Sequence, residues 1–382
     1  MSTFSRTDNS IISTWWWTVD RWLLMSLALL IIIGIVLVFG ASPAVAERIG
    51  LPSFHFVQRQ IIFLLMSVAA MFCVSLMPPV MVRRFGIILF AVCLLLLVAT
   101  LIVGPEVKGA RRWLPIGSFT LQTSEFIKPA FIIFSAWMLS QSQKVSGFAG
   151  WKISMISYMV VISLLILQPD LGQSILVSIV WGVQIFMAGL AWAWVFGLIA
   201  LGLVGILTAY IFLPHVAGRI DSFFHPENSD TFQVDQAMNA FRSGGLFGKG
   251  PGEGVVKIHL PDAHSDYIFA VAGEEFGVIV CLLIIGIFAV IVIRGFVNLL
   301  KEQDLFTVLA VAGLLIQFGI QAFINLAVNL SILPSKGMTL PFVSYGGSSM
   351  IALAIGMGMI LSLTRRYSQY KPGQTNLSWG QK

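Results

Sequence analysis

Long apolar runs separated by short polar segments are the feature that most constrains how this 382-residue chain can fold. A helix needs about 20 mainly apolar residues to cross the hydrocarbon core of a bilayer. Soluble domains carry about 25% charged residues, whereas this chain has only 10%. The sequence therefore predicts an all-α polytopic membrane protein, a bundle of about ten transmembrane helices. The expected spans are residues 22–41, 60–77, 86–104, 126–141, 151–168, 171–189, 191–213, 267–293, 304–326 and 346–364.

The loops predict both the domain organisation and the orientation. Lys and Arg gather in the short cytoplasmic loops of membrane proteins, and long loops count for less in this rule. With the long loop 214–266 set aside, the basic residues favour a cytoplasmic position for both termini. We therefore expect a cytoplasmic tail over 1–21, a single ten-span domain over 22–366 and a second cytoplasmic tail over 367–382. Loop 214–266, between the seventh and eighth spans, is then extracytoplasmic.

Several classes of site are excluded or disfavoured. The three cysteines lie inside apolar runs with no metal-ligand spacing, so we expect free buried thiols and no protein metal centre. The glycine-rich segment, residues 243–254, lacks the spacing of either common nucleotide-binding loop. The basic residues are scattered over loop ends, which is not a nucleic-acid footprint. On the predicted outer side, however, they concentrate in loops 105–125 and 214–266, which indicates a site for an anionic ligand.

Loop 105–125 carries the first candidate binding residues. Arg111 and Arg112 are adjacent, and guanidinium groups bind phosphate in a bidentate manner. Trp113 beside them can stack on a ligand. The alternative is an aromatic residue with two arginines that only anchor the chain at the membrane interface.

Charged residues also lie in the fourth span and just before the sixth. Lys128 follows Glu125 by three residues, close enough on a helix for the two to pair. A lysine inside a span is costly and marks a functional candidate, although a structural ion pair is an equal alternative. Asp170 follows a proline between two spans, where we expect it to cap the next helix.

The segment 259–275 carries four carboxylates from a polar loop into an apolar helix. A carboxylate at this boundary can accept a proton near neutral pH, so we predict that Asp266 is a general base. If the helix begins near Asp266, Glu274 lies about 80° around it and Glu275 about 180°. Glu274 then shares the side of Asp266. Alternatively, Asp262, His264 and Asp266 could together hold a divalent cation.

The last predicted loop contains two prolines and several glycines, which predicts a stiff, non-helical segment that dips toward the bundle. With it, six motifs in order resemble those of the SEDS family, whose members build the bacterial cell wall. The motifs are Gly-Ala-Arg-Arg-Trp (109–113), Ser-Glu-Phe-Ile-Lys (124–128), Gln-Pro-Asp-Leu-Gly (168–172), Leu-Pro-Asp-Ala-His-Ser-Asp-Tyr (260–267), Glu-Glu-Phe-Gly (274–277) and Leu-Pro-Ser-Lys-Gly-Met-Thr-Leu-Pro-Phe-Val-Ser-Tyr-Gly-Gly-Ser-Ser (333–349).

The resemblance implies a ten-span fold and peptidoglycan glycosyltransferase activity on lipid II in the bacterial inner membrane. It implies that Asp266 is the essential acid and that loss of Trp113 is damaging. It also implies a partner, a single-span class B penicillin-binding protein. The Lys336-Gly337 pair favours the division member of the family, with other divisome proteins at the septum, over the elongation member. A divalent cation, Mg²⁺ or Mn²⁺, is expected to assist.

On this hypothesis Asp266 deprotonates the 4-hydroxyl of the acceptor sugar, which attacks the donor and releases undecaprenyl pyrophosphate. Nearby cations would stabilise the leaving group, and Glu125 and Glu274 would orient those cations. A lipid II flippase and a non-catalytic divisome scaffold remain the alternatives. The predicted substrate-binding residues are Arg111, Arg112, Trp113, Glu125, Lys128, Arg219, Lys257, His264, Glu274, Lys336 and Ser344.

Overall fold

A computed structural model describes residues 10–365 of the chain, except 108, 118, 335, 336 and most of the stretch 190–231. The predicted span 191–213 falls largely in that stretch and lies outside the described residues, as does the predicted tail 367–382. Two predicted site residues, Arg219 and Lys336, are also outside them.

The other predicted spans all coincide with helices, which confirms the all-α membrane fold. Within the described ranges, six helices are long and apolar enough to cross a membrane, and α7 and α14 are shorter apolar helices. The helices are α2 (Arg21–Arg48), α3 (His55–Ser75), α4 (Pro79–Val103), α5 (Thr123–Lys144), α6 (Gly150–Leu167), α7 (Leu171–Met187), α12 (Ile268–Leu299), α13 (Leu305–Asn329) and α14 (Gly347–Leu363).

The connections also contain regular structure that the sequence did not predict. Loop 105–125 contains an antiparallel hairpin of β1 (Trp113–Ile116) and β2 (Phe119–Gln122), in the register Trp113↔Gln122. The predicted N-terminal tail contains a helix, α1 (Ile11–Thr18), so it is not a plain tail. Trp15 in α1 donates from Nε1 to Ser75 Oγ at 2.9 Å, which fastens α1 to the end of α3. The long loop contains α10 (Phe232–Gly244) and α11 (Val256–His259).

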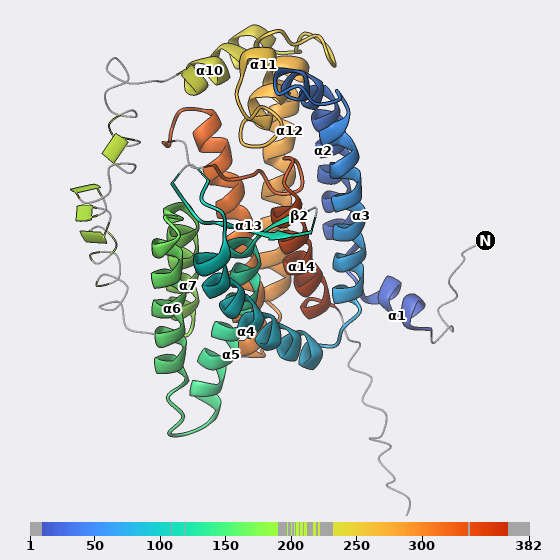
Figure 1. Cartoon of the computed structure of the whole chain (residues 1–382). Helices are drawn as coiled ribbons and strands as arrows, with labels where there is room; N and C mark the ends of the chain where they lie inside the picture. The colour runs from blue at the N-terminus through green and yellow to red at the C-terminus, as the bar shows by residue number, and fades with distance from the viewer. Residues whose placement is uncertain are drawn as a thin grey trace, which may run out of the picture.

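The core of the bundle lies around α13, the most enclosed of the long apolar helices. It packs against α5, α7, α12 and α14. Small residues let neighbouring backbones approach closely, as is usual in membrane bundles. A Cβ on Gly358 of α14 would lie 2.7 Å from the carbonyl oxygen of Met71 in α3. In Figure 1, α10 and α11 lie across one end of α12, and α1 lies at the opposite end of the molecule.

Helix α12 is interrupted at Gly277, whose φ of 78° and ψ of −178° are not helical. The glycine-rich segment supplies the hydrogen bonds that the break removes. Lys249 and Gly250 donate their backbone N–H groups to the carbonyls of Glu274 and Glu275, at 3.0 and 2.9 Å. Val278 in turn donates to the carbonyl of Gly245 at 3.0 Å. The glycines therefore permit backbone-to-backbone packing on a broken helix, a role that sequence reasoning missed.

The final loop spans residues 330–346, and its described residues, 330–334 and 337–346, are non-helical and dip into the bundle, as expected. Leu340, Phe342 and Val343 are buried. A Cβ on Gly34 of α2 would lie 2.4 Å from the carbonyl oxygen of Phe342, so the loop backbone lies directly against α2. Irregular backbone at this depth is tolerated because protein surrounds it.

Candidate functional site

Asp266 lies in a short turn, residues 261–267, immediately before α12 begins at Ile268. The helix begins close to its predicted start, but Asp266 itself is not helical, so the angular argument that placed Glu274 on its side does not apply. Two asparagines near the end of α13 hold the turn. Asn325 and Asn329 donate from Nδ2 to the backbone carbonyl of Asp266, at 2.9 and 2.8 Å. The backbone of Asp266 is thus held by α13, while the residue stays partly exposed.

The final loop forms the other wall of this turn. Ser344 donates from its hydroxyl to the carbonyl of Ser265 at 2.5 Å and accepts from the backbone N–H of Leu340 at 2.8 Å. Tyr345 donates its N–H to the carbonyl of His264 at 2.9 Å. Ser344 is buried and engaged as both donor and acceptor, which favours a role in joining the two segments over contact with a ligand.

The carboxylate of Asp266 faces the start of the final loop. A Cβ built on Gly337 would lie 3.4 Å from Asp266 Oδ2. Gly337 has a φ of 57°, a left-handed conformation that glycine adopts without strain. The loop therefore brings the residue that follows Lys336 to the carboxylate, although Lys336 itself is outside the described residues.

His264 is a buried, neutral ring in this site. Its ring centroid lies 4.4 Å from that of Phe56 and 5.1 Å from that of Tyr345. Burial lowers its pKa to about 4, with Asp262 opposing the shift and the Arg48 guanidinium adding to it. At neutral pH this imidazole carries no positive charge and cannot stabilise an anionic leaving group by Coulomb attraction.

Two exposed arginines approach the same site and were missed as site residues. Arg48, in the last turn of α2, points a guanidinium nitrogen at the carbonyl of Leu260 at 3.5 Å. Arg59 of α3 hydrogen-bonds to the hydroxyl of Tyr345. Both are visible in the sequence as outward-facing cations. They were not predicted as site residues because they lie on either side of the short connection between α2 and α3, far along the chain from the six motifs.

Lys257, Glu274 and Glu275 form a buried cluster that fastens α11 onto α12. The carboxylate of Glu274 accepts from the backbone N–H groups of Val256 and Lys257, at 2.7 and 2.9 Å. The Lys257 amine pairs with Glu275 and also donates to the carbonyls of Gly40 and Gly252, at 3.0 and 3.1 Å. These contacts argue against the predicted roles of Lys257 and Glu274 in substrate binding.

Of the two arginines predicted to bind phosphate in loop 105–125, one is turned toward the protein and one is exposed. Arg112 donates to the backbone carbonyls of Gln168 and Pro169 in the α6–α7 turn. Arg111 is exposed, donates to the carbonyl of Leu101 at 3.4 Å and lies 3.7 Å from Glu106. Trp113 is the first residue of β1 and is partly buried. Of the two arginines, only Arg111 keeps an exposed guanidinium for an external anion.

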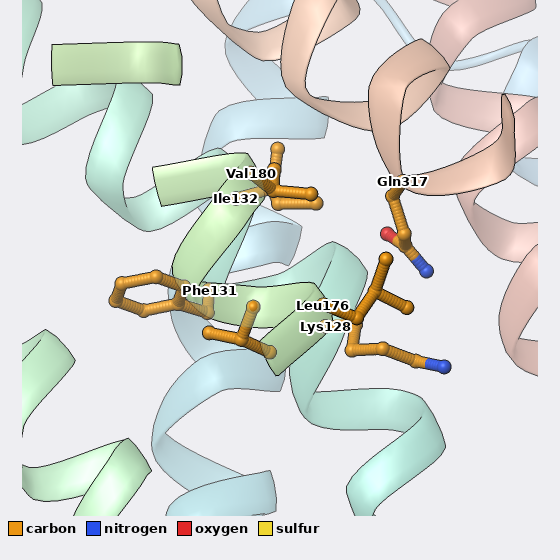
Figure 2. A pocket seen from close by; sticks show the side chains of 7 residues that line it. Lys128, Phe131, Ile132, Leu176, Val180 and Gln317 are labelled. Carbon is orange, nitrogen blue, oxygen red and sulfur yellow. The ribbon is translucent and has the colours of Figure 1, made fainter. Parts of the chain in front are cut away.

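Glu125 and Lys128 form the expected i,i+3 ion pair, at 2.8 Å, and the pair is buried inside the bundle. Glu125 also accepts from Gln173 at 2.6 Å, and Lys128 also donates to Gln321 of α13 at 3.1 Å. A narrow void beside Lys128 has no room for a water molecule; Figure 2 shows the Lys128 amine and the Gln317 amide toward one end of it, opposite the ring of Phe131. Lys128 is therefore a structural charge in this state.

Asp170 belongs to the same buried network. Its side chain does not cap α7, contrary to expectation, and instead accepts from the Ser124 hydroxyl at 3.0 Å. Burial raises its pKa, and the neighbouring Arg112 guanidinium only partly offsets this.

The residues do not fit a preformed divalent-cation site. Within the described ranges, no three His, Cys, Asp or Glu side chains converge in a way that could hold a metal ion. His264 packs against two aromatic rings at tilted angles, and Asp262 is exposed on the outside of the turn. We therefore derive no chemical step through a metal.

Comparisons with known proteins identify the family of the chain. The family model FtsW–RodA–SpoVE, described as cell cycle proteins, matches residues 20–369. A protein of Caulobacter vibrioides, described as a probable peptidoglycan glycosyltransferase FtsW, is 44% identical over 364 residues, which cover 95% of this chain and 93% of that protein. Stage V sporulation protein E of Bacillus subtilis is 35% identical over 359 residues, covering 92% and 98%.

Solved structures of similar fold point the same way. One is described as a peptidoglycan synthase complex in which polymerisation and crosslinking are coordinated; its matching chain has a TM-score of 0.75 at 26% identity, with 91% of this chain and 97% of that chain covered. The rod-shape-determining protein RodA of Thermus thermophilus matches with a TM-score of 0.69, 26% identity and the same coverage. The chain therefore belongs to the FtsW–RodA–SpoVE family of cell cycle proteins, the SEDS family.

Proposed function

We propose that this chain is a peptidoglycan glycosyltransferase that polymerises lipid II for the cell wall of the division septum, with Asp266 as its general base. The observation that carries the proposal is Asp266 itself, an acidic residue whose backbone carbonyl is held by two asparagines and which is partly exposed. The closest chemical role is proton abstraction from a sugar hydroxyl. The family relatives described as glycosyltransferases support the reaction class.

The proposed step is an inverting displacement at the anomeric carbon of the donor. The Asp266 carboxylate takes the proton of the acceptor 4-hydroxyl while that oxygen attacks the anomeric carbon of the donor. The bond from that carbon to the pyrophosphate breaks, with inversion, and undecaprenyl pyrophosphate leaves with the electron pair. A general base of this kind contributes about 10²–10⁴-fold in rate when it is well positioned. The two asparagine contacts supply that positioning.

The leaving group is anionic, so cations beside the turn should stabilise its departure. We assign this role first to Arg48 and Arg59, which are exposed and reach the Asp266 turn and the final loop. Arg111 is a further exposed candidate. Arg112, Lys128 and Lys257 are engaged with protein groups and take a structural role instead.

A class B penicillin-binding protein is the proposed partner, because a similar structure is described as a complex that coordinates polymerisation with crosslinking. We place both termini in the cytoplasm and the Asp266 turn on the outer side of the inner membrane, following the loop charges.

A lipid II flippase remains the second candidate, and one observation favours it. Transporters carry ionisable groups inside the bundle, and Glu125, Lys128 and Asp170 are buried there. These groups are, however, bonded to one another and to fixed neighbours, which suits a structural network better than a moving one.

The test uses the purified chain with its penicillin-binding partner in detergent, lipid II as substrate and glycan product resolved by gel. We expect Asp266→Asn to lower the polymerisation rate at least about 100-fold. Asp262→Asn is the matched control, because Asp262 is an exposed carboxylate in the same turn. A normal rate for Asp266→Asn would overturn the assignment. Transport across vesicles without polymer formation would favour the flippase, and growth unaffected by Asp266→Ala would favour the scaffold.

A further inference from the structure

A second cavity lies at the opposite end of α12 from Asp266. It has a volume of about 280 Å³, close to the lower limit of about 300 Å³ for ligand pockets. It opens where α1, the start of α2 and the ends of α12 and α14 meet. We call it the Arg294 pocket. Its lining residues are Trp17, Thr18, Val19, Asp20, Arg21, Trp22, Arg294, Asn298 and Thr364.

Hydrogen bonds around Asp20 make this pocket rigid. Asp20 caps α2 by accepting from the backbone N–H of Trp22 at 3.0 Å. It also accepts from Arg294 Nε at 2.9 Å and from Asn298 Nδ2 at 2.7 Å, both on α12. Burial opposes the ionised form of this carboxyl, but these donors outweigh it and lower the pKa of Asp20. The charged aspartate thus ties α2 to α12 across the floor of the pocket.

The α1 wall is also fixed in place. Trp15 donates to Ser75 at the end of α3 and packs edge-on against Phe72, with ring centroids 5.0 Å apart. Arg365, just beyond α14, donates to the Thr18 hydroxyl at 3.0 Å. The pocket therefore does not depend on a ligand to hold its shape.

Positive charge exceeds negative charge at this pocket. Arg294 uses its Nε on Asp20 and keeps about a third of its side chain exposed. The Arg21 guanidinium lies over the rings of Trp16 and Trp17, at 5.2 and 4.8 Å, and forms no salt bridge with any carboxylate of the described residues. Among the lining residues, one aspartate and two arginines leave a net charge of +1. This chemistry suits a phosphate group.

The surroundings of the pocket suit a lipid. Trp16, Trp17 and Trp22 are exposed around it, as tryptophans are at membrane interfaces. The two helices that frame it expose apolar side chains immediately beyond it, Met25 on α2 and Ile293 on α12, each 62% exposed. A free phosphate would use the arginines but not these apolar surfaces. Basic pockets between spans on the cytoplasmic side are known binding places for anionic lipid headgroups.

We propose that the Arg294 pocket binds the phosphate headgroup of an anionic phospholipid in the leaflet opposite the Asp266 site. The headgroup phosphate accepts from Arg21 and Arg294, and the acyl chains lie along the exposed faces of α2 and α12. Because the headgroup bridges these helices, the lipid stabilises the junction of α1, α2 and α12.

The test is native mass spectrometry of the full chain in detergent, titrated with phosphatidylglycerol or phosphatidylcholine of the same acyl chains. We expect phosphatidylglycerol to bind about fivefold more tightly, the factor that ~1 kcal/mol of attraction to the pocket's net charge of +1 supplies. Arg21→Gln, which breaks no hydrogen bond with the described residues, should remove most of this preference. Arg294→Gln should do the same. Lys301→Gln is the control, since Lys301 is an exposed cation beyond the end of α12.

Each result decides the proposal. An unchanged preference for phosphatidylglycerol in Arg21→Gln would overturn it. If the melting temperature shows that Arg294→Gln does not fold, the result for Arg21→Gln alone decides. An equal loss in Lys301→Gln would also overturn it, because it would indicate general surface attraction. Displacement of the lipid by glycerol phosphate at equal concentration would assign the pocket to a soluble phosphate compound instead.

Discussion

Asn329 holds both sides of the junction between the Asp266 turn and α12. Its Nδ2 donates to the backbone carbonyl of Asp266 at 2.8 Å, and its Oδ1 accepts from the backbone N–H of Ala270 at 3.1 Å. One fully buried amide therefore sets the position of the proposed base relative to the helix that follows it.

Replacing this amide should impair polymerisation through position. Asn329→Ala removes one partner from each group, but Asn325 still donates to the Asp266 carbonyl and the Tyr267 carbonyl still accepts from the Ala270 N–H. The cost in folding stability should therefore be only about 0.5–1.5 kcal/mol for each lost hydrogen bond. We expect kcat for lipid II polymerisation to fall about 10-fold or more, because small displacements of a base are costly, while KM changes little. Asn329→Asp keeps the acceptor for Ala270 but not the donor for Asp266. If its kcat matched that of the native protein, the positioning role would be wrong.

The buried pair of Lys257 and Glu275 should be strongly coupled. Both side chains are at most 5% exposed, and removing one partner of such a pair costs about 3–5 kcal/mol. We expect Glu275→Gln to lower the detergent melting temperature sharply. Lys257→Met with Glu275→Gln should cost less than the two single changes added together. Lys144→Gln, in an exposed pair with Asp304, should cost about 1 kcal/mol or less.

Gly277 should not tolerate a side chain. Its φ is 78°, and a Cβ there would lie 2.3 Å from the carbonyl oxygen of Leu246, a backbone atom that cannot move aside. We expect Gly277→Ala to destabilise the fold by roughly 1–3 kcal/mol and to release the glycine-rich segment, which faster backbone hydrogen exchange over 244–254 would report. Gly286→Ala in the same helix meets nothing within 4 Å and should be neutral. Equal effects of the two changes would contradict this account of the break.

Among the described residues, local composition was enough to predict the long apolar helices, because the length of an apolar run indicates a span. The interruption of α12 was not predictable in that way. The local pattern predicts an uninterrupted helix through Glu274-Glu275-Phe276-Gly277. The break is stabilised instead by hydrogen bonds from the glycine-rich segment, which lies about thirty residues earlier in the chain.

In the candidate site, too, local sequence predicted some features, and contacts with distant residues determined the others. Asp266 was identified from its own acidic neighbourhood, and the Glu125–Lys128 pair from its helical spacing. The partners of Arg112 lie in the α6–α7 turn, far along the chain, so a residue that reads as a phosphate ligand proves to bind backbone carbonyls. Arg48 contacts Leu260, just before the Asp266 turn, and Arg59 contacts Tyr345 of the final loop. These contacts depend on how α2 and α3 pack, which no local sequence pattern predicts.

His264 should make the stability of the protein depend on pH. Its ordinary pKa is about 6.5, and burial lowers it to about 4 in the folded protein. Between these values the unfolded chain binds the proton and the folded chain does not, so acid favours unfolding. The contribution is unchanged above about pH 6.5 and falls by roughly 3 kcal/mol as the pH drops toward 4. His264→Phe keeps an aromatic ring in contact with Phe56 and Tyr345 and removes the titration. Melting temperatures from pH 7 to 4.5 should therefore decline less steeply in this variant than in the native protein. Parallel declines would show that the imidazole is not held neutral by burial.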